Sequence, residues 1–345
     1  MRTFGKPRAF LAGSSVVAAT CWAAWAFGQG TDHLQQCLGV GKLGADVLIR
    51  ECTAAVESGG HALPMLYLTR AAAYAGKGDY QRALADYDEA IKLAPHTALA
   101  FALRGEVHAK RRDYDSAIAD YERAIEFEPN LASAFSNRGL AWASKGELRL
   151  AIADYTKAIQ LDPGLSVAFN NRGNAHAARG EPEAAIADYG EAIRLDPKYV
   201  IAYDNRANAH FKKREYDRAI ADFTAALQLQ GSDRVALLGR CWAHTLTGQL
   251  PAAVADCNQL LRLQPGDAPA LNLRGFAHLK AGQMDKAIAD FDAVLRSDPN
   301  NVGSLYGRGL ARLKKHEVAQ GHADIAAAKA IKPDVEQELA GYGIQ

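Results

Sequence analysis

The spacing of the prolines constrains this chain more than any other feature. Seven prolines fall on one grid of 34 residues, and Gly231 takes the remaining grid point; the prolines are Pro95, Pro129, Pro163, Pro197, Pro265, Pro299 and Pro333. A fixed period of this size predicts a stacked repeat architecture, in which each unit buries its apolar face against its neighbours.

Each unit reads as two short helices joined by a turn. In the fourth unit the pattern predicts a helix from Val167 to Arg179, a turn at residues 180–182 and a second helix from Glu183 to Leu195. Apolar and small residues recur there at helical spacing. The second helix should end before Pro197, because the residue preceding a proline avoids the helical region.

Three columns of residues recur from unit to unit. A small residue occupies the first helix at Ala71, Gly105, Gly139, Gly173, Ala207, Cys241, Gly275 and Gly309. An alanine occupies the second helix at Ala83, Ala117, Ala151, Ala185, Ala219, Ala253 and Ala287. An aromatic residue follows at Tyr87, Tyr121, Tyr155, Tyr189, Phe223 and Phe291.

These columns closely resemble the tetratricopeptide repeat family, from Pro64 to Pro333. The resemblance implies an all-α fold, a right-handed α-solenoid superhelix of stacked antiparallel helix pairs. We expect eight tandem units over residues 64–333. A degenerate repeat should precede them at residues 29–63, and a short cap should follow at residues 334–345, with a last turn through Val335 and Leu339.

An arginine and an aspartate also recur in every unit, sixteen residues apart. The arginines are Arg70, Arg104, Arg138, Arg172, Arg206, Arg240, Arg274 and Arg308; the aspartates are Asp86, Asp120, Asp154, Asp188, Asp222, Asp256, Asp290 and Asp324. A ligand-binding charge ladder is one interpretation. We favour ion pairs that lock the two helices of a unit, because guanidinium suits bidentate pairing and stacking needs the same residue in every unit.

The N-terminus has the pattern of a secretory signal. A basic start at Arg2, Lys6 and Arg8 precedes an uncharged apolar stretch from Ala9 to Phe27, with small residues near its end. Residues 1–28 therefore predict a signal peptide, with an uncleaved signal anchor as the alternative. The chain is expected to be exported, to the periplasm, or anchored in the inner membrane and facing the periplasm.

The cysteines beyond this segment form two pairs by position. Cys37 with Cys52 and Cys241 with Cys257 each join the first and second helix of one unit. An exported chain is free to oxidise such pairs, so both are expected to form disulfides. The alternative is that each cysteine is simply a small buried residue.

Nothing in the sequence indicates an enzyme. The histidines of one column, His108, His176, His210, His244 and His278, stand one to a repeat, whereas a metal site needs several ligands around one ion. No cofactor or metal is expected. The 40 basic residues nearly balance the 39 acidic ones, which argues against a nucleic-acid partner.

The family's groove, which is formed by first helices and grips peptides, points to candidate binding residues. A column of asparagines runs through Asn137, Asn171 and Asn205, with Asn170, Asn174, Asp204 and Asn208 beside it. It resembles the asparagine ladder of some superhelical members of the family. Amides can hold a peptide backbone, since they donate and accept. Aromatic groove positions follow at Phe211, Trp242, Phe276 and Tyr306. Helix-to-helix bonding for the amides and packing for the aromatics remain open.

The sequence therefore predicts a non-catalytic scaffold that binds a protein or peptide segment in this groove. Two alternatives remain: an adaptor subunit of an envelope protease or cell-wall enzyme, and an envelope-assembly protein that self-associates into a homo-oligomer. Contact with a membrane is expected only through an uncleaved N-terminal segment.

Overall fold

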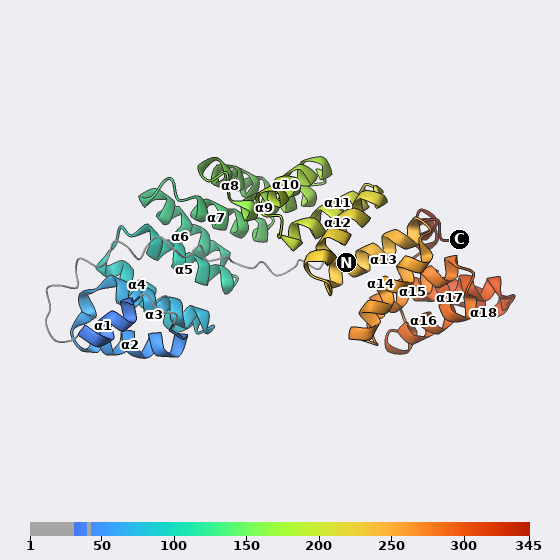
Figure 1. Cartoon of the computed structure of the whole chain (residues 1–345), viewed down its shortest axis with the longest axis horizontal. Helices are drawn as coiled ribbons and strands as arrows, with labels where there is room; N and C mark the ends of the chain where they lie inside the picture. Colours follow the sequence, from blue (N-terminus) through green and yellow to red (C-terminus); the bar gives the residue numbers. More distant parts are fainter. Residues whose placement is uncertain (1–30, 40–42) are drawn as a thin grey trace. The chain divides into compact units, whose positions relative to one another are not determined.

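The computed structural model describes residues 31–39 and 43–345, and every regular element among them is a helix (Figure 1). The signal predicted at residues 1–28 lies outside the described residues. Within them, no helix has the length and apolar character needed to cross a membrane. The prediction of an all-α fold is confirmed, and consecutive helices pair along the chain as an α-solenoid.

The chain divides into two compact units between Glu147 and Leu148. The first unit contains the helices α1 (Thr31–Leu38), α2 (Ala45–Glu57), α3 (Pro64–Gly76), α4 (Tyr80–Leu93), α5 (Ala98–Lys110), α6 (Tyr114–Phe127) and α7 (Ala132–Lys145), with a short 3₁₀ turn, η2 (Gly60–Ala62), before α3.

The second unit begins with α8 (Leu148–Leu161) and ends with α19 (Val335–Ala340). Its first helices are α9 (Ser166–Ala178), α11 (Val200–Lys212), α13 (Arg234–Leu246), α15 (Ala268–Lys280) and α17 (Val302–Lys314). Its second helices are α10 (Pro182–Leu195), α12 (Tyr216–Leu229), α14 (Leu250–Leu263), α16 (Met284–Ser297) and α18 (Val318–Ile331). Consecutive first helices contact each other, from α9 to α17.

The small-residue column exists because an aromatic ring lies against it. A Cβ on Gly173 would come within 2.7 Å of the Tyr189 ring, and one on Gly275 within 2.7 Å of the Phe291 ring. The rings of Tyr189 and Phe291 are both buried. First and second helices therefore approach closely only where the first helix carries little or no side chain.

The repeated arginine joins neighbouring repeats as well as the two helices of its own repeat. Arg172 donates from Nε and Nη2 to the Asp188 carboxylate at 2.9 and 2.7 Å, and from Nη1 to the Thr156 hydroxyl of the preceding second helix at 3.1 Å. The same aspartate pairing is formed by Arg70, Arg104, Arg206, Arg240, Arg274 and Arg308. Arg138 and Asp154 fall on opposite sides of the division, and their pairing stays a prediction.

Both predicted cysteine pairs lie at disulfide distance. Cys37 and Cys52 join α1 to α2 with their Cα atoms 4.8 Å apart. Cys241 and Cys257 join α13 to α14 with their Cα atoms 6.0 Å apart. All four side chains are buried.

Candidate binding surface

The surface formed by α9, α11, α13, α15 and α17 of the second unit carries most of the predicted binding residues. We call it the first-helix face. On α11, Ile201, Asn205 and Asn208 follow at intervals of four and three residues, so they share one stripe of the helix. Ile201 is 41% exposed, and Asn208 is exposed at the other end of the stripe. The face therefore offers solvent both apolar and amide groups.

Two of the predicted asparagines bond across neighbouring first helices. The Asn205 amide on α11 donates to the Asn170 carbonyl oxygen on α9 at 2.9 Å. Asn170 is 3% exposed and its own amide reaches Asn171 at 3.5 Å. Asn170 is thus a bridge between helices, while Asn171 and Asn205 are half-buried at the surface. The structure splits the predicted ladder into a buried row and a surface row.

The surface row continues at Asn174 and Asn208, which are exposed on α9 and α11. The Tyr189 hydroxyl donates to the Asn174 carbonyl oxygen at 2.8 Å, so its amide hydrogens remain available for a ligand. Burial raises the pKa of Tyr189, which keeps this hydroxyl protonated as a donor. The Asn208 side chain forms no hydrogen bond within the described part of the chain.

Asp204 occupies on α11 the place that Asn170 occupies on α9, but its surroundings differ. Asn170 bonds the residue 35 positions later, Asn205; the corresponding residue for Asp204 is Gly239, which has no side chain. Within residues 43–345 the Asp204 Oδ1 atom has no hydrogen-bond partner, and the residue is 7% exposed. Burial, with the nearby Asp233 carboxylate adding to it, raises the pKa of Asp204 to about 8.

The aromatic positions divide by exposure. Phe276 is 2% exposed and Tyr306 is 3% exposed, so both rings are buried in this structure. Trp242 is half-buried and packs 5.8 Å from Phe276, ring centroid to ring centroid. Phe211 packs on Tyr216 of the following helix at 5.2 Å. Phe276 and Tyr306 therefore do not present rings to a ligand while their present covering stays in place.

Asn137 lies on α7 in the first unit, half-buried. Its continuity with Asn171 and Asn205 stays a prediction, because they belong to the second unit.

Histidines of this column contact residues in the turn that follows their own helix. His176 and His210 contact the glutamates five residues later, Glu181 and Glu215, each at 2.6 Å. His278 bonds Gln283 at 2.9 Å in the same way. Among the described residues no cluster of three potential metal ligands forms.

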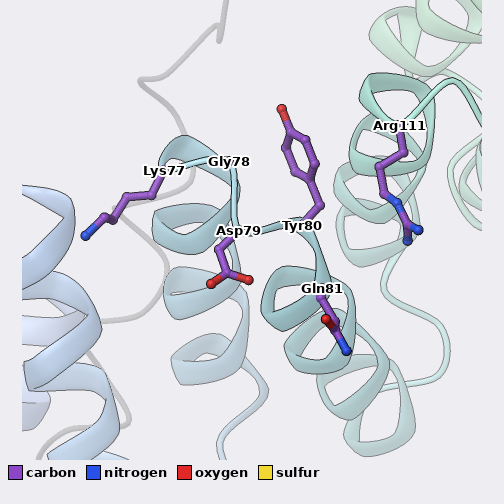
Figure 2. Close-up of a pocket in the computed structure, with 6 residues that line it drawn as sticks. All are labelled: Lys77, Gly78, Asp79, Tyr80, Gln81 and Arg111. Atoms are coloured by element: carbon purple, nitrogen blue, oxygen red, sulfur yellow. The ribbon is translucent and has the colours of Figure 1, made fainter.

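A surface hollow in the first unit lies at the turn between α3 and α4. Figure 2 shows that its side chains, Lys77, Asp79, Tyr80, Gln81 and Arg111, point in different directions rather than toward one centre. Lys77 pairs with Asp46, and Asp79 caps α4 by accepting from the Arg82 backbone. These groups hold helix ends, so the hollow has no converging chemistry.

Sequence profiles of one repeat family match the chain in several places. Tetratricopeptide repeat profiles match residues 68–132 and 205–268, residues 132–165 and residues 268–301, and a profile described as TPR repeat matches residues 173–213. The chain belongs to the tetratricopeptide repeat family. No curated protein matches it in sequence.

Solved tetratricopeptide repeat structures share the fold. The structure titled for Pseudomonas aeruginosa pilF is 22% identical with a TM-score of 0.54, covering 61% of this chain and 96% of that one. PilW, described as a type IV pilus biogenesis factor, is 22% identical with a TM-score of 0.55, covering 59% of this chain and 94% of that one. A Parabacteroides merdae tetratricopeptide repeat protein is 21% identical with a TM-score of 0.54, covering 72% and 99%.

Sequence reasoning missed two parts of this surface. Ile201 and Val235, which are 41% and 49% exposed, extend the first-helix face beside the amides. Their shared position, 34 residues apart, was the available signal. It also missed that Tyr342 packs against Trp242 at 5.8 Å, ring centroid to ring centroid. The spacing of Val335, Leu339 and Tyr342, which places all three on one helical face, was the available signal there.

Proposed function

We propose that this tetratricopeptide repeat protein is a non-catalytic scaffold whose first-helix face holds a segment of a partner protein. The scaffold role is typical of the fold; the seat at α9 and α11 is the specific part of the proposal. The partner segment would lie across Asn171, Asn174 and Asn208, extended or helical, with apolar side chains reaching Ile201 and Val235.

The observation that carries this proposal is the pairing of a buried amide row with an exposed one. Asn170 and Asn205 use their bond to fix α9 against α11. That bond joins the two helices that carry the exposed amides of Asn174 and Asn208. Amides presented on two helices held together in this way can donate to and accept from a peptide backbone.

We also propose that the chain works outside the cytoplasm. Two buried cysteine pairs at disulfide distance suit an oxidising compartment, because cytosolic thiols are kept reduced. The prediction of a signal at residues 1–28 agrees with this proposal. Alkylation of the protein purified from a periplasmic fraction, with and without reductant, tests it: protection of all four cysteines without reductant is the expected result.

The binding proposal is tested by affinity purification with a double variant, Asn171→Ala with Asn208→Ala. The Asn208 side chain has no hydrogen bond in the described chain, and Asn171 accepts only the long 3.5 Å contact from Asn170, so helicity should stay unchanged and the unfolding temperature should change little. Proteins captured by the wild type from envelope extract, identified by mass spectrometry, should be lost or reduced ~tenfold with the double variant. Gln228→Ala, at an exposed position on the second helix α12, is the matched control.

Unchanged capture by the double variant would rule out the seat at α9 and α11. The identity of the captured proteins distinguishes the adaptor role from the general scaffold role, because an adaptor should capture a protease or a cell-wall enzyme. Light scattering tests the self-association alternative, which predicts that the molar mass of the purified protein rises with its concentration.

A further inference from the structure

The first-helix face of α13, α15 and α17 is covered by the chain itself. Residues 335–344, which we call the C-terminal segment, form α19 and the turn that ends it. Figure 1 shows the C-terminal end of the chain beside α13. The segment thus returns along the second unit instead of continuing the stack of helix pairs.

The C-terminal segment is a short amphipathic helix laid with its apolar side on this face. Val335 is 2% exposed and packs in one cluster with Tyr306 of α17. Leu339 packs against that cluster and against the next one, which contains Phe276 of α15. Tyr342 packs edge-on to Trp242 of α13 at 5.8 Å. Three positions spaced by four and three residues therefore pack on clusters or rings that belong to three successive first helices.

The end of the segment is held in a defined geometry. The Ile344 amide donates to the Leu339 carbonyl at 3.0 Å and the Gly343 amide to the Ala340 carbonyl at 2.9 Å, with Gly343 at φ +70°. This is the Schellman pattern that ends a helix at a left-handed glycine. Ile344 is 1% exposed and buried in the cluster of Phe276 and Leu279. Arg214, in the turn after α11, donates to the Gly341 carbonyl at 2.8 Å.

We propose that this aromatic part of the face is a docking seat for a short amphipathic helix, and that the C-terminal segment is its resident occupant, which a partner helix displaces. The partner helix would present aliphatic residues at the positions of Val335 and Leu339, an aromatic residue at that of Tyr342 and a branched aliphatic one at that of Ile344. This inference rests on the proposed function, because it assigns a second seat on the same face.

The size of the contact agrees with a displaceable occupant. Beyond α17 and α18, the segment contacts the rest of the unit through the apolar side chains of Leu339, Tyr342 and Ile344. Arg214 adds a hydrogen bond to the Gly341 carbonyl and lies over the Tyr342 ring. A helix in a groove is read through a few apolar anchors spaced in this way. The covalent link of the segment to α18 compensates for the small contact, because a linked segment acts at an effective concentration on the order of millimolar.

The test uses a fluorescent synthetic peptide that copies residues 333–345, measured by anisotropy against the full chain. A loosened variant, Tyr342→Ala with Ile344→Ala, keeps Val335 and Leu339 over α17. We expect the peptide to bind the loosened variant at least ~tenfold more tightly than the wild type. Adding Trp242→Ala to the loosened variant should weaken binding ~tenfold, whereas adding Trp142→Ala, on α7, should not.

A second variant guards against loss of folding in the first. Gly343→Ala keeps every apolar anchor, but it places a Cβ at a left-handed position and should increase peptide binding about fivefold. Gly180→Ala, at φ +80° in the turn after α9, carries the same backbone strain away from the seat and should leave peptide binding as in the wild type.

Equal peptide affinity for the wild type, the loosened variant and Gly343→Ala, or no binding up to about 1 mM, would overturn the proposal. A wild-type dimer that the loosened variant lacks would make the occupant a second copy and would overturn it as well. The asparagines at α9 and α11 are not part of this seat. If the peptide does not bind as expected, while the double variant Asn171→Ala with Asn208→Ala no longer captures the partner protein, this inference is wrong and the proposed function is retained.

Discussion

Arg214 and Gly341 are joined by a 2.8 Å hydrogen bond, although 127 residues separate them in the chain. Other side-chain hydrogen bonds between repeats of the described chain span about one repeat, as between Asn205 and Asn170. The Arg214 bond reaches over several repeats because the C-terminal segment lies back along the first helices. It links the turn after α11, a helix that carries amides of the first-helix face, to the end of α19, which packs on the aromatic residues of that face.

The Arg172–Asp188 pair should contribute far more stability than an exposed pair of similar charge. Asp188→Asn removes the carboxylate that receives two guanidinium bonds, and its side chain is 8% exposed. We expect it to lower the free energy of unfolding by ~2 kcal/mol. Glu191→Gln, in the exposed pair with Arg194, should cost under ~0.5 kcal/mol. Urea denaturation followed by circular dichroism measures both, and equal costs would contradict a locking role for the repeated arginine.

Asp204 should make the second unit less stable as the pH rises. Its pKa is raised from 3.8 to about 8, so the folded state keeps a proton that the unfolded state has already lost. Stability then falls as pH rises from about 4 to about 8 and levels off above that. Asp204→Asn removes this penalty and should raise the free energy of unfolding at pH 8.5 by on the order of 5 kcal/mol, with little change at pH 4.

Urea denaturation of wild type and Asp204→Asn at both pH values measures that difference. Asp233, the carboxylate that acts on Asp204, caps α13 by accepting from the Val235 and Ala236 amides. Asp217→Asn, at an exposed site on α12, is the control. A parallel pH profile for wild type and Asp204→Asn would show that Asp204 is charged at neutral pH.

Gly239 should tolerate no side chain while Phe223 keeps its ring. A Cβ at Gly239 would lie 2.2 Å from Phe223 Cζ, and Phe223 is fully buried. Gly239→Ala should therefore cost ~2 kcal/mol by overpacking. Adding Phe223→Leu should recover part of that cost, which a double-mutant cycle measures directly. Gly266→Ala, with nothing within 4 Å, is the control. Additive costs in the cycle would mean that the ring is not what Gly239 accommodates.

Opening the Cys37–Cys52 bond should loosen the start of the described chain. Cys37→Ala with Cys52→Ala releases a closure of 15 residues, which in the chain-entropy model corresponds to ~3 kcal/mol. Hydrogen exchange of α1 and α2 should accelerate accordingly. The matched variant, Cys241→Ala with Cys257→Ala, opens a similar loop where α13 and α14 each contact helices on either side. Loss of the second bond should accelerate hydrogen exchange of α13 and α14 less than loss of the first accelerates that of α1 and α2. The opposite result would mean that the interior repeat depends more on its crosslink.

The sequence by itself determined the features that recur within each repeat. The period, the helix pairs, the close approach of Gly173 to Tyr189 and the two cysteine pairs depend on contacts within one repeat. Such contacts are encoded by residues a fixed distance apart in the sequence. The pattern can be recognised because it recurs from repeat to repeat. The helix predicted from Val167 to Arg179 is α9, Ser166–Ala178, displaced by one residue at each end.

Only the tertiary structure decided what differs between repeats. Asn170 and Asp204 hold the same place in the pattern, yet Asn170 accepts from Asn205 while the Asp204 Oδ1 atom has no partner in the described chain. The residue that corresponds to Asn205 in the next repeat is Gly239, which has no side chain to offer. The covering of Phe276 by Ile344 depends on how several repeats stack before the chain returns. Repetition specifies how neighbouring helices meet; the position of a distant segment results from the accumulated geometry of the stack, which no local pattern contains.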